Sequence, residues 1–230
     1  MELPQQLAAL TPRGPNDIAA AAHATQANVV TLRVAWQRRT TLACGQLEIH
    51  TPSPGRVRRM RKILLDRRVI NSYELEEIHL RLRQVWGEFC ALCWLFPFVD
   101  PQQPISFDDL PPGQTLRCPA DLHAKLDEVQ KHLWRIRHEQ RRRHDRDAVR
   151  DPDFRRADEI AMHLAIRVFG QAVHTCRDDV LLCAACEHAG MLAALRWASD
   201  DRWAWEAPGI MDVVLSADHL SESSEGSNGE

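Results

Sequence analysis

Apolar residues recur at helical spacing between Asn71 and Val99, where the chain has its most regular pattern. Asn71 followed by Glu74 predicts a capped helix start, and Pro97 predicts the end. Residues 89–96 are apolar on every side, which is typical of a helix enclosed by other helices. This fully apolar stretch, 89–96, is shorter than the roughly 20 apolar residues of a membrane span. We therefore expect a buried central helix over about 72–96. The residues that form its stripe are Leu75, Ile78, Leu82, Val85, Phe89, Leu92 and Phe96.

Weaker patterns predict further helices over about 17–42, 56–68, 121–149, 153–174 and 178–197. The stripe of the 121–149 helix alternates steps of four and three residues up to Ile136. Beyond that point its sequence is strongly charged, so we expect the helix end to project into solvent. In the 153–174 helix we expect Ala157, Ile160, Leu164 and Val168 to point inward. Strand signals are scarce. These patterns predict an all-α fold, an irregular bundle of five to seven helices around the central helix.

Proline and polar residues divide the chain into segments. Residues 1–15 are predicted to be a loose N-terminal segment, and 16–198 a helical domain that contains a Pro-rich loop over 97–119. Residues 199–220 form a Trp-bearing, acidic C-terminal segment. The polar residues 221–230 are predicted to be disordered.

Composition narrows the class of protein. The chain has 230 residues and a formal net charge of −3, which argues against a protein that is cationic overall. Its seven cysteines are an odd number, several lie within apolar helical pattern, and no secretory signal is visible. We therefore expect an intracellular protein, in the cytoplasm or nucleus, with free thiols and no membrane segment.

A cluster of cysteines and histidines in the C-terminal half has ligand types that zinc prefers. Cys176, Cys183, Cys186 and His188 are the predicted metal ligands, with His174 as an alternative to His188. The spacing also fits buried structural thiols, because free cysteine is commonly buried. A further alternative pairs Cys90 and Cys93 with Cys183 and Cys186 in a four-thiolate site.

Two stretches are rich in arginine. The first, 56–68, contains one acid, Asp66, and predicts phosphate or nucleic-acid binding. Its candidate contact residues are Arg56, Arg58, Arg59, Arg61 and Lys62. The alternative is a solvated helix face. The second stretch, 135–156, interleaves arginine with Asp and Glu, which indicates ion pairs along an exposed helix.

Arg137 with His144, and Arg167 with His174, match the R-x4–6-H pattern, with six residues between Arg and His in each case. In this respect the chain resembles the HEPN ribonucleases. That resemblance covers eight residues in each case. It implies an all-α fold and RNA cleavage by residues paired across a dimer, with Arg orienting the phosphate and His moving protons.

The acidic C-terminal segment contains Trp203, Trp205 and Ile210, which we predict to anchor a protein partner. The alternative is that these side chains pack back on the bundle. Taken together, the patterns favour a non-catalytic interaction or regulatory protein that binds a protein partner, with nucleic acid as a second candidate ligand. A HEPN-like ribonuclease and a structural protein that forms homo-oligomers are the alternatives.

Overall fold

The computed structural model describes residues 12–44, 72–101, 115–145 and 147–200, together with 202 and 205. Its α-helices are α1 (Pro15–Cys44), α3 (Ser72–Trp94), α4 (Pro119–His144), α5 (Pro152–His163) and α6 (Asp178–Ser199). The shorter elements are η3 (Ala148–Arg150), β1 (Arg167–Val168), β2 (Gln171–Ala172) and η4 (Val173–Thr175). The predicted all-α fold is confirmed, and the predicted helices at α1, α3 and α6 are found within a few residues of their expected bounds.

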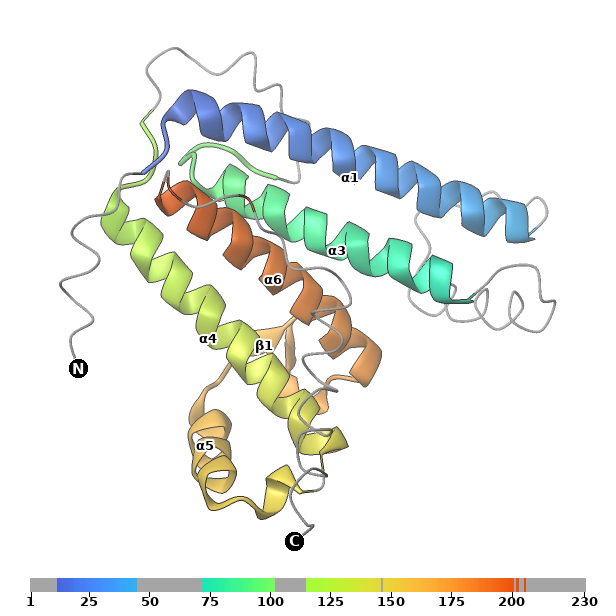
Figure 1. Cartoon of the computed structure of the whole chain (residues 1–230), viewed down its shortest axis with the longest axis vertical. Coiled ribbons are helices and arrows are strands. Elements are labelled where there is room, and N and C mark those ends of the chain that lie inside the picture. Colours follow the sequence, from blue (N-terminus) through green and yellow to red (C-terminus); the bar gives the residue numbers. More distant parts are fainter. Residues whose placement is uncertain are drawn as a thin grey trace, which may run out of the picture.

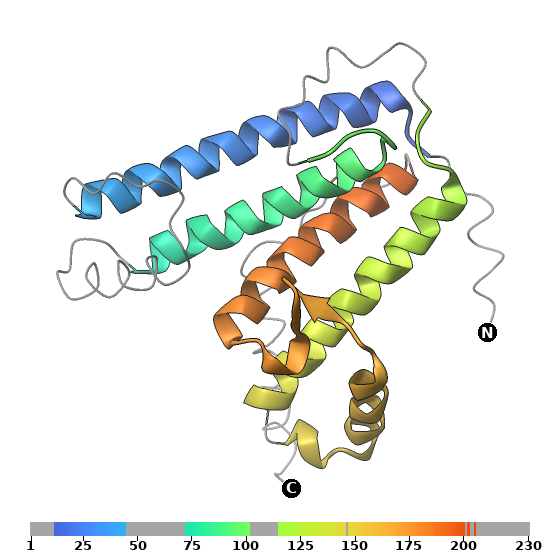
Figure 2. The same ribbon diagram turned by 180° about the vertical axis from the view of Figure 1, so that it is seen from behind.

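The four long helices lie side by side in the order α1, α3, α6, α4 (Figures 1 and 2). α1 runs antiparallel to α3, α3 and α6 run in the same direction, and α4 runs antiparallel to α6 (Figure 1). α3 and α6 therefore share the middle of the row, since each has a long helix on both sides. The predicted central helix is confirmed, but it shares that position with α6.

Two glycines allow α3 and α6 to approach closely. A Cβ atom on Gly87 would lie 2.0 Å from the carbonyl oxygen of Glu187, and one on Gly190 would lie 2.1 Å from that of Gln84. Any larger side chain would overlap with backbone that belongs to the other helix. The contact therefore requires glycine on both helices.

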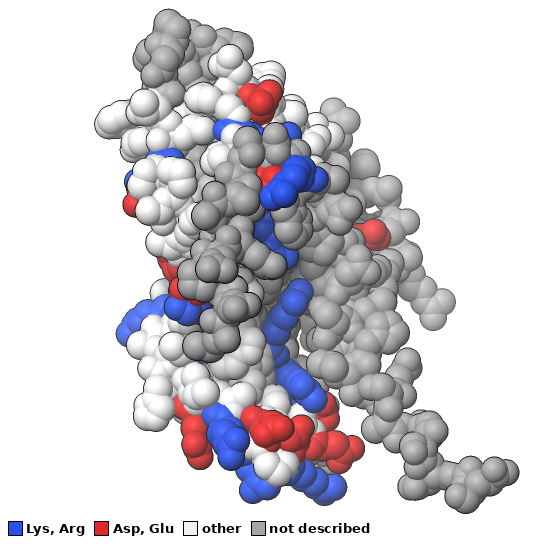
Figure 3. All heavy atoms as spheres, turned by 60° about the vertical axis from the view of Figure 1, so that its left-hand side comes forward, with Lys and Arg blue, Asp and Glu red and all other residues white. Residues whose placement is uncertain are grey.

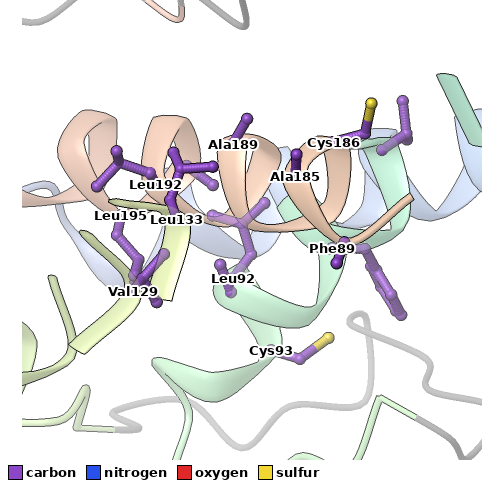
Figure 4. Packing of buried hydrophobic residues seen from close by; sticks show 14 of the residues in the cluster. Phe89, Leu92, Cys93, Val129, Leu133, Ala185, Cys186, Ala189, Leu192 and Leu195 are labelled. Carbon is purple, nitrogen blue, oxygen red and sulfur yellow. The ribbon is translucent and has the colours of Figure 1, made fainter. Parts of the chain in front are cut away.

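Apolar side chains from all four long helices form one core. Figure 4 shows Val129 and Leu133 of α4 beside Leu192 and Leu195 of α6, with Leu92 of α3 next to them. The predicted stripe of α4 is confirmed up to Ile136, which is fully buried. α6 is long and apolar enough to cross a membrane by length and composition, but half of that stretch is buried within this row of helices.

The predicted helix over 153–174 is wrong in its second half. α5 begins where Pro152 occupies its first turn and the Asp151 side chain accepts a hydrogen bond from the Asp153 amide at 2.8 Å. It ends at His163, and a two-stranded hairpin follows in which Arg167 pairs with Ala172. Ile160, predicted to point inward, is 59% exposed.

Candidate interaction surfaces

The arginine-rich end of α4 is folded inward around Glu139, whose side chain is 0% exposed. Glu139 accepts hydrogen bonds from Arg135 at 3.2 Å, from Arg142 at 2.7 and 3.2 Å, and from Arg143 at 2.9 Å. Burial alone would raise the pKa of Glu139, but the arginine hydrogen bonds outweigh burial and lower this pKa to about 2. Glu139 is therefore ionised at neutral pH, and its charge is compensated inside the protein.

Elements that follow α4 in the chain cover this buried carboxylate. Arg143 donates hydrogen bonds to the carbonyl oxygens of His174 and Cys176, at 3.0 and 2.7 Å. His138 lies between the rings of Trp134 and Phe154, and its Nε2 lies 3.0 Å from Asp158 Oδ1. These contacts tie the end of α4 to η4 and α5, which lie beside it in Figure 1.

The expectation that this end of α4 projects into solvent is therefore wrong. The helix stops at His144 instead of about 149, and Arg135, His138, Glu139 and Gln140 are buried. At the lower end of the molecule, Lys and Arg side chains alternate with Asp and Glu, so neither sign of charge dominates there (Figure 3). A mixed surface of this kind offers little attraction to phosphate.

The predicted zinc ligands lie in separate surroundings. Cys176 is buried and lies 3.4 Å from the carbonyl oxygen of Ala172. The sulfur of Cys183 lies 3.9 Å from His79 Nδ1, whereas Cys186 is fully buried in the core. His188 Nδ1 donates a hydrogen bond to the Ala184 carbonyl oxygen at 2.8 Å.

The chemistry of these groups gives zinc binding no support. Burial raises the pKa of Cys183 to about 11 and that of Cys186 to about 12, so both are protonated thiols at neutral pH. Figure 4 shows Cys93 and Cys186 at opposite edges of the labelled group of core side chains. Within the described ranges, no three His, Cys, Asp or Glu side chains are arranged to hold a metal ion. Zinc binding stays a prediction.

Most of the predicted partner and nucleic-acid residues lie outside the described part of the chain. These are Trp203, Ile210, Arg56, Arg58, Arg59, Arg61 and Lys62. Trp205 is half-buried, and its ring centroid lies 4.9 Å from that of Trp197 on α6. The guanidinium of Arg13 lies over the indole of Trp197, 4.4 Å from its ring centroid.

The residues that resemble the HEPN pattern occupy different kinds of structure. Arg137 and His144 are both on α4, whereas Arg167 is on β1 and His174 is in η4. His144 and His174 come to the same corner of the molecule, because Arg143 contacts the His174 carbonyl oxygen and Asp178, and His144 Nε2 lies 3.8 Å from the same aspartate. Both histidines are exposed.

The outward side of α1 is a surface that we did not single out in the sequence. Ile18, Ala22, Thr25 and Val29 form the buried stripe of this helix, and α1 packs along α3. On the opposite side an exposed stripe repeats at steps of four and three residues and contains no charge. Its members are Ala20, Ala24, Ala27, Thr31 and Val34. The sequence shows that α1 is rich in alanine. It does not show that this helix lies at the edge of the row, where one of its sides stays exposed.

No family model, curated protein or solved structure matches this chain.

Proposed function

We propose that this chain is a non-catalytic interaction protein that binds a helix of a protein partner along the outer side of α1. The observation that carries the proposal is the uncharged, exposed stripe on a helix whose other side is already packed. A helix with apolar residues on opposite sides is ordinarily enclosed by neighbours on both. In this fold the outer side of α1 is left exposed.

The geometry of the stripe suits a second helix. A helix of 30 residues is about 45 Å long, so α1 offers several turns for contact. Alanine at the contact positions allows two helix backbones to approach closely. The Thr31 hydroxyl donates to the Ala27 carbonyl oxygen at 2.8 Å, so this side chain needs no partner for its polar group. Val30, which flanks the stripe, is 56% exposed.

The test is the double variant Ala24→Glu, Ala27→Glu in the full chain, with Arg33→Glu as the control, because Arg33 is exposed on another side of the same helix and its replacement changes the net charge by the same amount. The binding readout is quantitative affinity purification from the cells that contain the protein, and the melting temperature is measured in parallel. The proposal expects the double variant to lose a partner while its melting temperature stays within about 3 °C of wild type. Retained partners, or loss of the same partners in Arg33→Glu, would contradict it.

The proposal has two further parts, a regulatory contact through the C-terminal segment and nucleic-acid binding through residues 56–68. Trp203, Trp205 and Ile210 are the proposed anchors of the first. If a chain cut after Ser199 keeps its partners, that part fails. Reversing the charges of Arg58, Arg59 and Arg61 tests the second, which fails if binding to RNA and DNA at low salt does not change.

A ribonuclease is the second candidate, and one observation favours it, namely that His144 and His174 lie at one exposed corner with Arg143. Two imidazoles and a guanidinium are the groups that phosphodiester cleavage uses. This candidate predicts RNA cleavage that is lost in His144→Ala and in His174→Ala and kept in His163→Ala. An absence of cleavage by the wild-type chain would contradict it.

A further inference from the structure

The hairpin between α5 and α6 has an unusual residue at its tip. β1 and β2 are joined by the two-residue loop Phe169–Gly170, in which φ is 48° for Phe169 and 80° for Gly170. Loops with two positive φ angles favour Asn-Gly or Gly-Gly, because a Cβ atom is disfavoured in this region of backbone space. The bulky phenylalanine is therefore strained at a position where asparagine would be comfortable.

The core of the protein does not explain this phenylalanine. Phe169 is 51% exposed, whereas its neighbour Val168 and the nearby Val173 are buried and hold the hairpin in place. The aromatic ring faces α3, where the guanidinium of Arg83 lies 5.3 Å from the ring centroid. Backbone strain at a residue whose side chain stays half exposed is characteristic of positions kept for a contact with another molecule.

Hydrogen bonds fix the segment that directly follows the hairpin. Arg143 donates to the carbonyl oxygens of His174 and Cys176, and the Cys176 amide donates to the Val173 carbonyl oxygen at 3.2 Å. Cys176 itself is buried. A side chain presented on a fixed support loses little conformational entropy when it binds, so the geometry favours a preformed contact.

Two arginines lie near the ring. Arg167 donates to the Gly170 carbonyl oxygen at 3.1 Å, which keeps its guanidinium beside the loop. The guanidinium of Arg83 also lies 3.5 Å from the carboxylate of Glu187. Burial raises the pKa of Glu187, and the charge of Arg83 opposes this rise. At the start of α6, Asp178 is paired with Arg143 and Asp179 with Arg177. The tip therefore carries an aromatic ring with Arg83 against it and Arg167 bonded to the next residue of the loop.

We propose that Phe169, flanked by Arg83 and Arg167, is the anchor of a second protein-docking surface, and that its partner offers an apolar pocket edged by carboxylates. Aromatic residues and arginine dominate the energy of protein interfaces, and complementary charge orients the partner. The surface lies beside α4 and α6, on the other side of α3 from α1 (Figure 2), and it does not depend on the outer side of α1.

The test begins with photo-crosslinking in the full chain. p-Benzoylphenylalanine is placed at Phe169 or, as the control, at Phe98, which is 89% exposed after the end of α3. Proteins crosslinked only from position 169 are identified by mass spectrometry, purified, and titrated against wild type, Phe169→Asn, Phe98→Asn and Arg83→Gln. Melting temperatures of all four proteins are measured alongside.

The proposal expects the crosslinked peptide of the partner to contain Asp or Glu. It expects affinity to fall at least about tenfold in Phe169→Asn and about threefold in Arg83→Gln, with no change in Phe98→Asn. The melting temperature of Phe169→Asn should equal or exceed that of wild type, because Asn-Gly suits the loop. A purely structural Phe169 would instead lower it.

Four results would overturn the proposal. They are an absence of crosslinks specific to position 169, crosslinks only to a second copy of the chain, a crosslinked peptide without acidic residues, and unchanged affinity of Phe169→Asn. The double variant Ala24→Glu, Ala27→Glu should bind this partner normally. Failure at one surface is therefore distinguishable from failure at the other.

Discussion

Glu139 and Glu88 are both buried carboxylates, yet their surroundings shift their pKa values in opposite directions. Glu139 accepts hydrogen bonds from three arginines, and its pKa is lowered to about 2. Glu88 is 5% exposed, and its Oε1 atom has no hydrogen-bond partner among the residues that the structure describes. Burial raises the pKa of Glu88 to about 7, against a smaller opposing effect of Arg81.

The comparison shows that burial alone does not determine what a charged residue does for a fold. At the end of α4, a buried carboxylate organises arginines from its own helix, and one of these arginines reaches η4. At the contact of α3 with α6, a buried carboxylate is only weakly compensated by Arg81, in a close helix contact where a Cβ on Gly190 would be 3.2 Å from the Glu88 amide nitrogen. The first stabilises the fold when ionised, and the second stabilises it only when protonated.

The largest effect is expected from Glu139→Gln, which removes the charge that compensates the buried Arg135. Breaking a buried ion pair on one side leaves an unpaired charge, so the free energy of unfolding should fall by about 3 kcal/mol. Urea denaturation at pH 7.5 measures this loss. Glu128→Gln is the control, because its carboxylate is exposed and pairs with Lys125 on the surface. If Glu139→Gln lowered the free energy of unfolding as little as the control does, the ion pairs around Glu139 would not behave as buried ones.

The second effect is expected from Gly190→Ala, which tests whether the α3–α6 contact is as tight as its geometry indicates. The added methyl group would meet the Gln84 carbonyl oxygen, so the helices must separate, at a cost of about 2–3 kcal/mol. Gly14→Ala is the matched control, since its nearest new contact is an ordinary 3.6 Å to the Asp17 side chain. Equal melting temperatures for the two variants would contradict the account.

The third effect concerns pH and Glu88. The pKa of this residue is about 7 in the folded protein and 4.5 ordinarily, so the folded state holds the proton more tightly. This contribution to stability is complete below pH 4.5 and is lost as the pH rises to 7. We expect Glu88→Gln to raise the free energy of unfolding by roughly 2 kcal/mol at pH 8.5 relative to wild type. This gain in the free energy of unfolding should vanish near pH 4.5. A gain that did not depend on pH would contradict a buried Glu88 carboxyl that titrates in this range.

The smallest effect is expected from Asp158→Asn, which removes the charge that faces His138. The Asp158 side chain is partly exposed, so solvent screens this pair and the loss should be about 0.5 kcal/mol. Hydrogen exchange over α5 is the more sensitive measurement, because the pair ties α5 to α4. Unchanged exchange in α5 would show that the stack of His138 on Phe154 holds the helix by itself.

Apolar periodicity was sufficient to predict the helices that form the row. Leu92 of α3, Phe96 just after its end, and Leu133 and Ile136 of α4 are buried where their spacing placed them. The pattern works here because each of these helices buries an apolar stripe against a neighbour.

Periodicity along the sequence did not predict the structure at the end of α4, and there is a physical reason for this. Charges three and four residues apart have the same spacing in an exposed ion-paired helix and around a buried carboxylate, so the position of Glu139 could not be read from the sequence. The hairpin was missed because strands of two residues are too short to show alternation. Gly87 and Gly190 were a usable signal, since glycine inside a helix ordinarily destabilises it and therefore indicates a close contact.

The most direct test is one urea denaturation experiment at pH 8 on three proteins, namely wild type, Glu139→Gln and Glu88→Gln. Both variants remove one negative charge from a buried glutamate and preserve its shape. We predict opposite results, a lower unfolding midpoint for Glu139→Gln and a higher one for Glu88→Gln, because arginine hydrogen bonds outweigh burial at Glu139 whereas burial outweighs the effect of Arg81 at Glu88. Shifts of the same sign in both variants would contradict it.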